Sequence, residues 1–409
     1  MKSVVILGDG MADYPVSELD GKTPLMVAKK PAMDRIAREG RTGLFRTIQP
    51  DMPTGSAVAN LSVLGYDPRS TFSGRGVLEA ASLGIPVQPN DLVLRINLIT
   101  IEDGKIKSHS SGHISNGEAF QLIGDLQPLF AGLGVSLHQG LSYRHVLILP
   151  GGNADVDCTP PHDHIGEEAG VLGVRPLTDR AVPTAVLLNR LVSESQELLK
   201  SHPVNLRRIS EGRLPANSLW PWSPGKKPRM ESFEKRFGAR GAVISAVDLI
   251  KGLAVYAGMD VIQVDGATGL YDTNYEGKAA ACLETLKNHD FVYVHVEAPD
   301  EAGHDRNLNL KIQCIEDLDR RLVQRILDGL DRKAMEAVVA LLPDHPTPVA
   351  HGKHVRDPVP VAIRDRMSEP DRVSVFDEES VKQGSLGLLE GSAFIKTVLR
   401  RRGFPGAGD

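Results

Sequence analysis

Short hydrophobic runs recur along the chain and predict buried β-strands. The clearest are residues 4–7, 291–296 and 337–342, which consist almost wholly of aliphatic and aromatic residues. Strands that are hydrophobic at nearly every position are typical of a parallel sheet with helices on both faces. Two weaker runs, 261–264 and 359–363, are further strand candidates.

A long helical pattern separates the second of the clear runs from the third. Strand, helix and strand in this order are the signature of an α/β fold with a mostly parallel sheet. The hydrophobic positions of the helical pattern, spaced by three and four residues, are Ile312, Ile315, Leu318, Leu322, Ile326 and Leu330.

The middle of the chain has a different pattern, with weaker periodicity and denser turn signals from about residue 97 to residue 240. Within it, residues 202–229 carry five prolines, both tryptophans and a surplus of basic side chains. This composition favours an exposed linker whose charges are solvated. The alternative is a flap that meets an anionic substrate.

Composition and charge narrow the classes of partner and compartment. The chain has 409 residues and a net charge of −5, which gives no reason to expect a nucleic-acid or anionic-membrane partner. No hydrophobic run approaches the roughly 20 residues of a membrane span, and residues 4–7 are too short for a signal peptide. Three widely spaced cysteines, Cys158, Cys282 and Cys314, favour a reducing compartment. We therefore expect a cytoplasmic protein; its oligomeric state is left open.

A carboxylate follows each of the three clear hydrophobic runs. These residues are Asp9, Asp300 and Asp344. Sites in open parallel sheets form just beyond the carboxyl ends of the strands, so we expect the three aspartates to converge if their strands are neighbours. Carboxylates that repel each other at close range need a cation between them.

Histidines accompany two of these aspartates. His304 comes four residues after Asp300, His345 directly follows Asp344, and His354 lies nine residues further on. Mixed imidazole and carboxylate ligands suit Zn²⁺, Mn²⁺ or Fe more than Mg²⁺ or Ca²⁺, and three of each are enough for two ions. The alternative is structural: the Asp300–His304 pair would be an ordinary surface pair on a helix, and Asp9 a turn residue.

Ser56 is a candidate nucleophile. It precedes a short helical segment that ends at Gly65, and it occupies the expected N-cap position. Serine is common at N-caps for structural reasons alone. The free N–H groups and positive dipole end of a helix N-terminus also suit a phosphate, and a nearby metal ion could activate the hydroxyl.

Six motifs together resemble cofactor-independent phosphoglycerate mutases of the archaeal type, and the likeness is strongest in the two terminal thirds of the chain. The motifs are residues 8–13 (GDGMAD), 21–25 (GKTPL), 54–60 (TGSAVAN), 64–68 (LGYDP), 297–304 (EAPDEAGH) and 354–360 (HVRDPVP). The resemblance implies an alkaline phosphatase-like α/β core with a mostly parallel sheet, formed by residues 1–80 and 241–409. A second α/β domain, residues 81–240, would be inserted into this core and bind substrate.

The resemblance also implies roles for individual residues. Ser56 matches the serine that is transiently phosphorylated, and Lys251 matches a lysine that stabilises the phosphoryl group, although an ordinary surface lysine is the alternative there. His113, Arg144 and Arg75 resemble substrate contacts at the junction of the two domains; a structural hydrogen bond or a solvated charge is the alternative for each. The implied ligands are Asp9, Ser56, Asp344 and His345 for one ion, and Asp300, His304 and His354 for the other.

The activity implied is an isomerisation of 3-phosphoglycerate to 2-phosphoglycerate, as in glycolysis and gluconeogenesis, through a phosphoserine at Ser56. Two divalent ions are implied, with Mn²⁺ expected and Mg²⁺, Co²⁺ or Zn²⁺ as alternatives. The first motif also resembles a bacterial branch proposed to act as homoserine kinase, so a related phosphotransferase or a phosphomonoesterase is the alternative activity. A non-catalytic metal- or metabolite-binding protein of the same fold is a third hypothesis.

Overall fold

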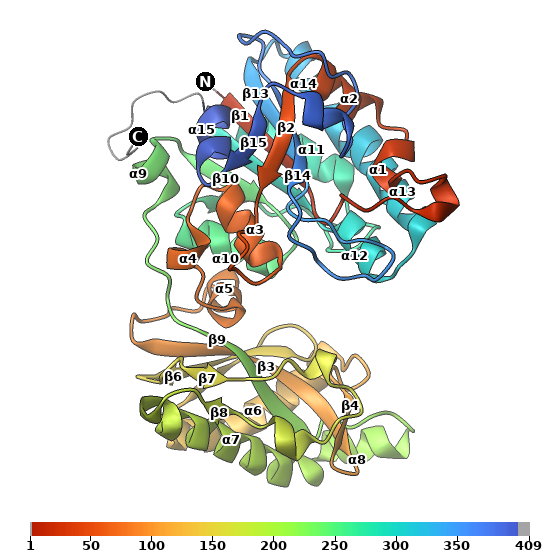
Figure 1. Cartoon of the computed structure of the whole chain (residues 1–409). Helices are drawn as coiled ribbons and strands as arrows, with labels where there is room; N and C mark the ends of the chain where they lie inside the picture. Colours follow the sequence, from red (N-terminus) through yellow and green to blue (C-terminus); the bar gives the residue numbers. More distant parts are fainter. Residues whose placement is uncertain (1, 400–409) are drawn as a thin grey trace. The chain divides into compact units, whose positions relative to one another are not determined.

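The structure is a computed structural model that describes residues 2–399 (Figure 1). These residues divide into two units. Unit 2 is the continuous segment Ser73–Pro228, and unit 1 comprises the described residues on either side of it.

Both boundaries lie earlier in the sequence than residues 80 and 240, where we expect them from the sequence. The helix α5 (Arg75–Ser82) packs on the sheet of unit 2 and belongs with it. The helix α9 (Phe233–Phe237) belongs to unit 1, because the Phe233 ring stacks on that of Phe291 with 4.8 Å between the centroids.

Unit 1 contains an eight-stranded sheet in the described part of the chain, with the order β11-β10-β12-β1-β13-β14-β2-β15. The strands from β11 to β13 in this order are mutually parallel, β14 is antiparallel to both of its neighbours, and β15 is parallel to β2. The strands are β1 (Lys2–Gly8), β2 (Arg41–Arg46), β10 (Gly241–Ile244), β11 (Asp260–Val261), β12 (Phe291–Val296), β13 (Ala337–Leu342), β14 (Val359–Arg364) and β15 (Gly387–Glu390).

The three clear hydrophobic runs form adjacent parallel strands, which confirms the mostly parallel α/β sheet. β1 lies between β12 and β13, with Gly8 opposite Val296 and Leu7 opposite Leu342. The weaker run at 359–363 is the antiparallel strand β14. The prediction for 261–264 was wrong beyond Val261, because β11 pairs over two residues only.

Helices cover both faces of this sheet. Val4 and Ile6 face a core formed with α2, α11, α13 and α14, whereas α3, α10 and α15 lie on the opposite side (Figure 1). The pattern from Ile312 to Leu330 forms two helices joined by a π-helical turn at Leu318–Val323. The helices of unit 1 are α1 (Pro24–Val27), α2 (Pro31–Arg38), α3 (Ser56–Val63), α4 (Pro68–Thr71), α9, α10 (Asp248–Tyr256), α11 (Tyr275–Thr285), α12 (Ala298–His304), α13 (Leu308–Asp317), α14 (Gln324–Arg332) and α15 (Ala393–Leu399).

Unit 2 is built around an antiparallel sheet in which β3 pairs with β4, β6 and β9, and β6 also pairs with β5. The helices α6 and α7 bury their hydrophobic residues against one face of this sheet. Its elements are α5, β3 (Asp91–Glu102), β4 (Lys105–Ser108), α6 (Asn116–Gly132), β5 (Ser136–His138), β6 (Arg144–Pro150), β7 (Val156–Asp157), β8 (Arg175–Pro176), α7 (Val182–Lys200), α8 (Pro203–Ser210) and β9 (Ser218–Gly225).

The interpretation of residues 202–229 as an exposed linker was wrong. This segment forms α8 and β9, and the side chains of Trp220 and Trp222 are buried. Arg208 is also buried, and its Nη1 donates to Glu118 Oε2 at 2.8 Å. The basic surplus is therefore partly neutralised inside unit 2.

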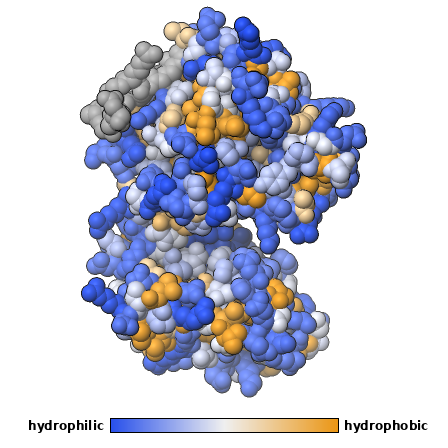
Figure 2. Space-filling model, viewed as in Figure 1, coloured by the Kyte–Doolittle hydropathy of each residue, from blue (hydrophilic) through white to orange (hydrophobic). Residues whose placement is uncertain are grey.

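On the face shown in Figure 2, hydrophobic residues form small separate groups between hydrophilic ones. Exposed hydrophobic side chains of unit 2 include those of Val171, Leu177 and Val186. No helix within residues 2–399 is both long and apolar enough to cross a membrane.

His145 makes the stability of unit 2 dependent on pH. Its imidazole is buried in β6, its Nδ1 accepts from Gly140 N at 3.2 Å, and burial lowers its pKa to about 3. The unfolded chain, with an ordinary histidine pKa near ~6.5, binds a proton below that pH that the folded chain refuses, so stability is lost as pH falls from about 6.5 towards 3. Between pH 7.5 and pH 5.0 we expect His145 to account for about 2 kcal/mol of lost stability.

Urea unfolding followed by tryptophan fluorescence measures this loss, because both tryptophans lie in unit 2. The His145→Gln variant keeps a hydrogen-bond acceptor and cannot titrate in this range. It should lose about 2 kcal/mol less than the wild type over the same pH interval. Equal losses in the two proteins would show that His145 does not cause the dependence.

Candidate active site

The three aspartates expected to converge do so at one edge of the unit 1 sheet. Asp9 follows β1, Asp344 follows β13, and Asp300 lies in α12, which begins directly after β12. All three side chains are buried. The three strands are parallel neighbours, so their carboxyl ends lie at the same edge of the sheet. This strand order alone explains why the three aspartates meet, as the sequence predicts.

Four of the predicted residues form a first cluster, with His345 at its centre. The Nε2 atom of His345 lies 3.2 Å from Ser56 Oγ, 3.6 Å from Asp9 Oδ1 and 3.5 Å from Asp344 Oδ2. Its other ring nitrogen, Nδ1, lies 3.3 Å from Thr347 Oγ1. Two carboxylates, an imidazole nitrogen and a hydroxyl thus face one point, and their donor set fits a divalent cation.

Ser56 is the first residue of α3, not its N-cap as the sequence predicts. Gly55 takes the N-cap position with φ 145°, a conformation that disfavours residues with a Cβ. The Ser56 hydroxyl makes no capping hydrogen bond and is directed to His345 instead. It therefore lies at the positive end of the helix and is available as a nucleophile.

Asn60, one turn further along α3, connects the helix to the same cluster. Its amide nitrogen donates to Asp344 Oδ2 at 2.9 Å and to the Ser56 carbonyl at 2.8 Å. The Tyr293 hydroxyl of β12 donates to the Asn60 Oδ1 atom. Asn60 is fully buried, so these bonds fix the start of α3 relative to Asp344.

The remaining three predicted ligands form a second cluster. Asp300 Oδ2 lies 3.0 Å from His304 Nε2, and Asp300 Oδ1 lies 3.4 Å from His354 Nε2. The two Nε2 atoms are 2.9 Å apart. The Nδ1 atom of His304 is 2.8 Å from the Gly352 carbonyl, which requires a proton on Nδ1 and makes Nε2, the nitrogen that faces Asp300, the one able to bind a metal ion once it loses its proton. A histidine oriented in this way is typical of a metal ligand.

The two clusters are adjacent. The His345 and His354 rings stack with 3.9 Å between their centroids. Gly10 allows the loop after β1 to approach closely, since it adopts φ 58° and a Cβ there would lie 2.3 Å from Asp300 Oδ1. Its backbone N–H donates to Asp344 Oδ1 at 3.2 Å, so one small residue touches both clusters.

The carboxylates respond in opposite ways to this crowding. Burial, followed by repulsion from Asp344, raises the pKa of Asp9 well above its ordinary value. Burial also opposes ionisation of Asp300, but hydrogen bonds from His304 and His354 outweigh it and lower the Asp300 pKa. The hydrogen bond to Asp300 raises the pKa of His304 to about 9. Protons held by Asp9 and His304 therefore reduce the repulsion between the carboxylates, as a bound cation would. Binding of a cation would release these protons.

Lys251 lies in α10, which packs against α3. Its Nζ atom is 3.3 Å from Asp248 Oδ1, and its side chain is largely buried. Its charge also acts on Lys278, whose pKa is lowered to about 8, chiefly by burial. Lys251 is thus a largely buried cation next to the helix that carries Ser56, not a freely solvated one.

The three residues predicted to contact substrate all belong to unit 2, whereas both clusters belong to unit 1. Arg75 and Arg144 are exposed, and both lower the pKa of the buried Arg95, although burial lowers it more. The Arg144 guanidinium lies 5.6 Å from the centre of the Tyr143 ring. The centre of the His113 ring lies 6.3 Å from the centre of the same Tyr143 ring. Arg144 and His113 therefore lie beside the same Tyr143 ring, and Arg75 and Arg144 both act on Arg95.

Sequence reasoning missed several residues that support the site. Lys311 is fully buried in α13, where its Nζ donates to Asp13 Oδ2 and to the Thr347 carbonyl, each at 2.8 Å. It thereby joins the loop after β1 to the loop after β13. His295 and Glu297, at the end of β12, lie beside Asp9. Asn60 is the one supporting residue for which the sequence offered a signal: it lies four residues after Ser56, a spacing that places both on the same face of a helix.

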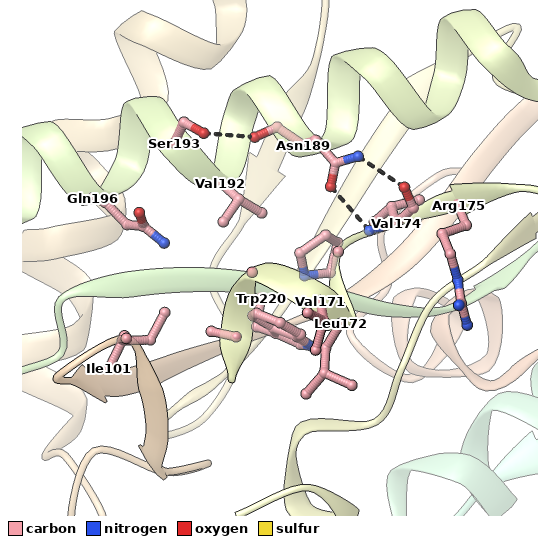
Figure 3. A pocket seen from close by; sticks show the side chains of 15 residues that line it. Ile101, Val171, Leu172, Val174, Arg175, Asn189, Val192, Ser193, Gln196 and Trp220 are labelled. Atoms are coloured by element: carbon pink, nitrogen blue, oxygen red, sulfur yellow. Dashed lines mark hydrogen bonds between the residues drawn. The ribbon is translucent and has the colours of Figure 1, made fainter. Parts of the chain in front are cut away.

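A pocket of about 580 Å³ lies elsewhere, in unit 2, between the Ala169–Leu172 turn, α7 and β9 (Figure 3). It contains none of the predicted site residues. The Asn189 amide on its wall is occupied by the backbone of Val174, with bonds of 2.9 and 2.8 Å, and Ser193 Oγ donates to the Asn189 carbonyl. Asn189 therefore holds the backbone of Val174, just after the turn, to α7.

Comparisons with known proteins all indicate the same family. The family model described as 2,3-bisphosphoglycerate-independent phosphoglycerate mutase matches residues 37–205. A 2,3-bisphosphoglycerate-independent phosphoglycerate mutase from Methanosarcina acetivorans is 48% identical over 407 residues, which cover 98% of this chain and 100% of the relative. A probable enzyme of the same name from Geobacter sulfurreducens is 45% identical over 406 residues, again 98% and 100% of the two chains.

Solved structures are similar over the full length as well. A protein from Pyrococcus horikoshii has a TM-score of 0.84 and 33% identity, with 99% of each chain covered. A cofactor-independent phosphoglycerate mutase from Thermoplasma acidophilum has a TM-score of 0.68 and 30% identity, with 98% of this chain and 99% of that chain covered.

Proposed function

This chain belongs to the 2,3-bisphosphoglycerate-independent phosphoglycerate mutase family of isomerases, and we propose that it interconverts 3-phosphoglycerate and 2-phosphoglycerate through a phosphoserine at Ser56. The position of Ser56 is the main support for its proposed role as the nucleophile. The hydroxyl opens α3, makes no capping bond and faces the buried Asp9–Asp344–His345 cluster from 3.2 Å.

Two divalent ions complete the proposed site, with Mn²⁺ preferred because the ligands mix imidazole and carboxylate. When bound, such ions lower the pKa of a coordinated hydroxyl and neutralise phosphoryl oxygens. The first ion would be held by Asp9, Ser56, Asp344 and His345, and the second by Asp300, His304 and His354.

The protein's own groups position the nucleophile and the phosphate. Asn60 and Tyr293 fix the start of α3, so that the Ser56 hydroxyl and the free N–H groups of the first turn face the same point. As the Ser56 oxygen attacks phosphorus, the Ser56 hydroxyl gives up its proton, the bond from phosphorus to the 3-oxygen of phosphoglycerate breaks, and the 3-oxygen takes up one proton in exchange. The 2-hydroxyl of the same glycerate then attacks phosphoserine, which restores Ser56. One difficult transfer is thereby divided into two easier ones.

The basic residues have matching roles in this proposal. Lys251 neutralises charge on the phosphoryl group in transit. Arg75, Arg144 and His113 supply charge-assisted hydrogen bonds to the anionic substrate. We place the reaction in the cytoplasm, as a step of glycolysis and gluconeogenesis, because the three cysteines are free, as in a reducing compartment.

Phosphorus NMR of the protein with 3-phosphoglycerate and Mn²⁺ tests the proposal. We expect 2-phosphoglycerate to appear until both esters reach a constant ratio, with no added bisphosphoglycerate and no free phosphate in proportion to turnover. Starting from 2-phosphoglycerate must give the same final ratio. Stoichiometric release of phosphate, or no conversion with any divalent ion, would contradict the mutase proposal.

A further inference from the structure

A third group of ligand atoms lies beside the first cluster, and two of its three residues have no role in the proposed reaction. It consists of Asp9, His295 and Glu297, each of which offers one atom within 4.8 Å of the others. The His295 Nε2 atom is 2.8 Å from Asp9 Oδ2 and 3.5 Å from Glu297 Oε2. Ligands about 2.1 Å from one ion lie about 3 Å apart when they are adjacent. These distances therefore suit three ligands of a single ion.

Asp9 is the residue common to both groups, and its two oxygens face different ways. Oδ1 lies nearest His345, whereas Oδ2 lies nearest His295. Oδ1 is buried and makes no hydrogen bond, although the Asp9 side chain is wholly shielded from solvent. A carboxylate arranged in this way can bridge two cations.

His295 is oriented as a ligand by its other nitrogen. Its Nδ1 atom lies 3.2 Å from Ser245 Oγ, and Ser245 Oγ also accepts from Val247 N at 3.0 Å. When Nδ1–H donates to this hydroxyl oxygen, the Nε2 lone pair faces Asp9 and Glu297. Metal-binding histidines are commonly held through the second ring nitrogen in this manner.

In the described part of the chain, Glu297 makes no ion pair with a lysine or arginine. Its Oε2 atom is buried without a hydrogen bond, and within residues 2–399 no Lys or Arg nitrogen lies within 4.0 Å of its carboxylate. The nearby Lys278 is directed elsewhere, since its Nζ donates to the His295 carbonyl at 3.0 Å. Burial of an unpaired carboxylate is costly, and a cation held by its oxygen removes that cost.

Charge balance points in the same direction. Four carboxylates, those of Asp9, Asp300, Asp344 and Glu297, surround the two clusters. Two divalent ions only balance these four charges, so neutralisation of a phosphate dianion is then left to Lys251 and the basic residues of unit 2. An additional divalent ion adds positive charge next to Ser56.

We propose that Asp9, His295 and Glu297 form a third divalent-cation site, which shares Asp9 with the first cluster. The site goes beyond the proposed function, because it concerns how many ions the chain holds and does not depend on Ser56 chemistry. Its ligands are one imidazole and two carboxylates, a set that suits Mn²⁺ or Zn²⁺.

Counting ions tests this site. The full chain is stripped of metal and titrated with Mn²⁺, and electron paramagnetic resonance measures the free ion at each step. We expect three Mn²⁺ bound per wild-type chain and two per chain of the Glu297→Gln variant, which keeps the shape of the side chain. The His295→Asn variant should also bind two, and serves if Glu297→Gln fails to fold. Circular dichroism reports the folded state of each variant.

The matched control is Glu301→Gln, which removes another carboxylate from α12 that belongs to none of the ligand groups. It should still bind three ions. A wild-type count of two, or three ions retained in folded Glu297→Gln and His295→Asn, would overturn the proposal. Failure of the mutase proposal is separate: it would appear as absent conversion of phosphoglycerate at any ion count.

Discussion

The Ser56→Ala variant is expected to lose mutase activity by at least about 10⁴-fold in kcat, because removal of a covalent nucleophile leaves no route for the first transfer. The variant should also fail to form phosphoserine when it is mixed with phosphoglycerate. Rates of 2-phosphoglycerate formation and mass spectrometry of acid-quenched protein measure the two effects. The fold should remain, since the Ser56 hydroxyl makes no capping bond and the N-cap position belongs to Gly55.

A matched control comes from the same helix. Ser62 is buried in α3, and its hydroxyl donates to the Val58 carbonyl at 3.3 Å, away from both clusters. Ser62→Ala removes the same atom from the same element and should retain most of the activity. A Ser56→Ala protein that turns over at a rate within tenfold of the Ser62→Ala protein would exclude the phosphoserine route.

The sequence predicted the centre of this site because its residues obey simple geometry. Asp9, Asp300 and Asp344 each follow a strand, and parallel neighbouring strands end at the same edge of a sheet. The four-residue spacing of Asp300 and His304 places both on one face of α12. These relations need no knowledge of distant contacts, so periodicity and strand ends were enough to find them.

The residues that the sequence did not reveal depend on long-range packing. His295 lies inside a hydrophobic run and has no distinguishing pattern, yet β12 carries it to Asp9. Lys311 looks like one more charged position on a helix, but α13 buries it against the loop at Thr347. Burial of a charge becomes evident only when the facing elements are known.

Proline misled the interpretation of residues 202–229. Pro221 and Pro224 argue against a central strand, because proline cannot donate to a ladder. Among the strands that the structure describes, β9 pairs with β3 alone, so it is an edge strand and its prolines are tolerated.

The N-cap prediction for Ser56 was wrong by one residue. The N-cap of α3 is Gly55, whose backbone adopts a conformation that serine disfavours.

Removal of metal is expected to abolish activity and to lower stability at the same time. The stripped protein should lose at least about 10³-fold in kcat, because the hydroxyl of Ser56 and the phosphoryl oxygens lose their neutralising charges. Readdition of Mn²⁺ should restore the rate. Stability should also fall on stripping, by about 3 kcal/mol for each ion removed, relative to protein in Mn²⁺ at 100 times its dissociation constant.

The physical reason for the lost stability is the crowding of buried carboxylates. Without a cation, burial and repulsion from Asp344 raise the pKa of Asp9, so the site must take up a proton to relieve the charge. Metal binding reverses this and releases protons, which calorimetry in two buffers of different ionisation enthalpy measures directly.

The Asp34→Asn variant is a suitable control. Asp34 lies in α2, accepts a hydrogen bond from Lys30 Nζ at 3.1 Å and contributes to neither cluster, so its replacement should leave the proton release unchanged. Full turnover by the stripped protein, or metal binding without proton release, would contradict a site in which cations replace protons among buried carboxylates.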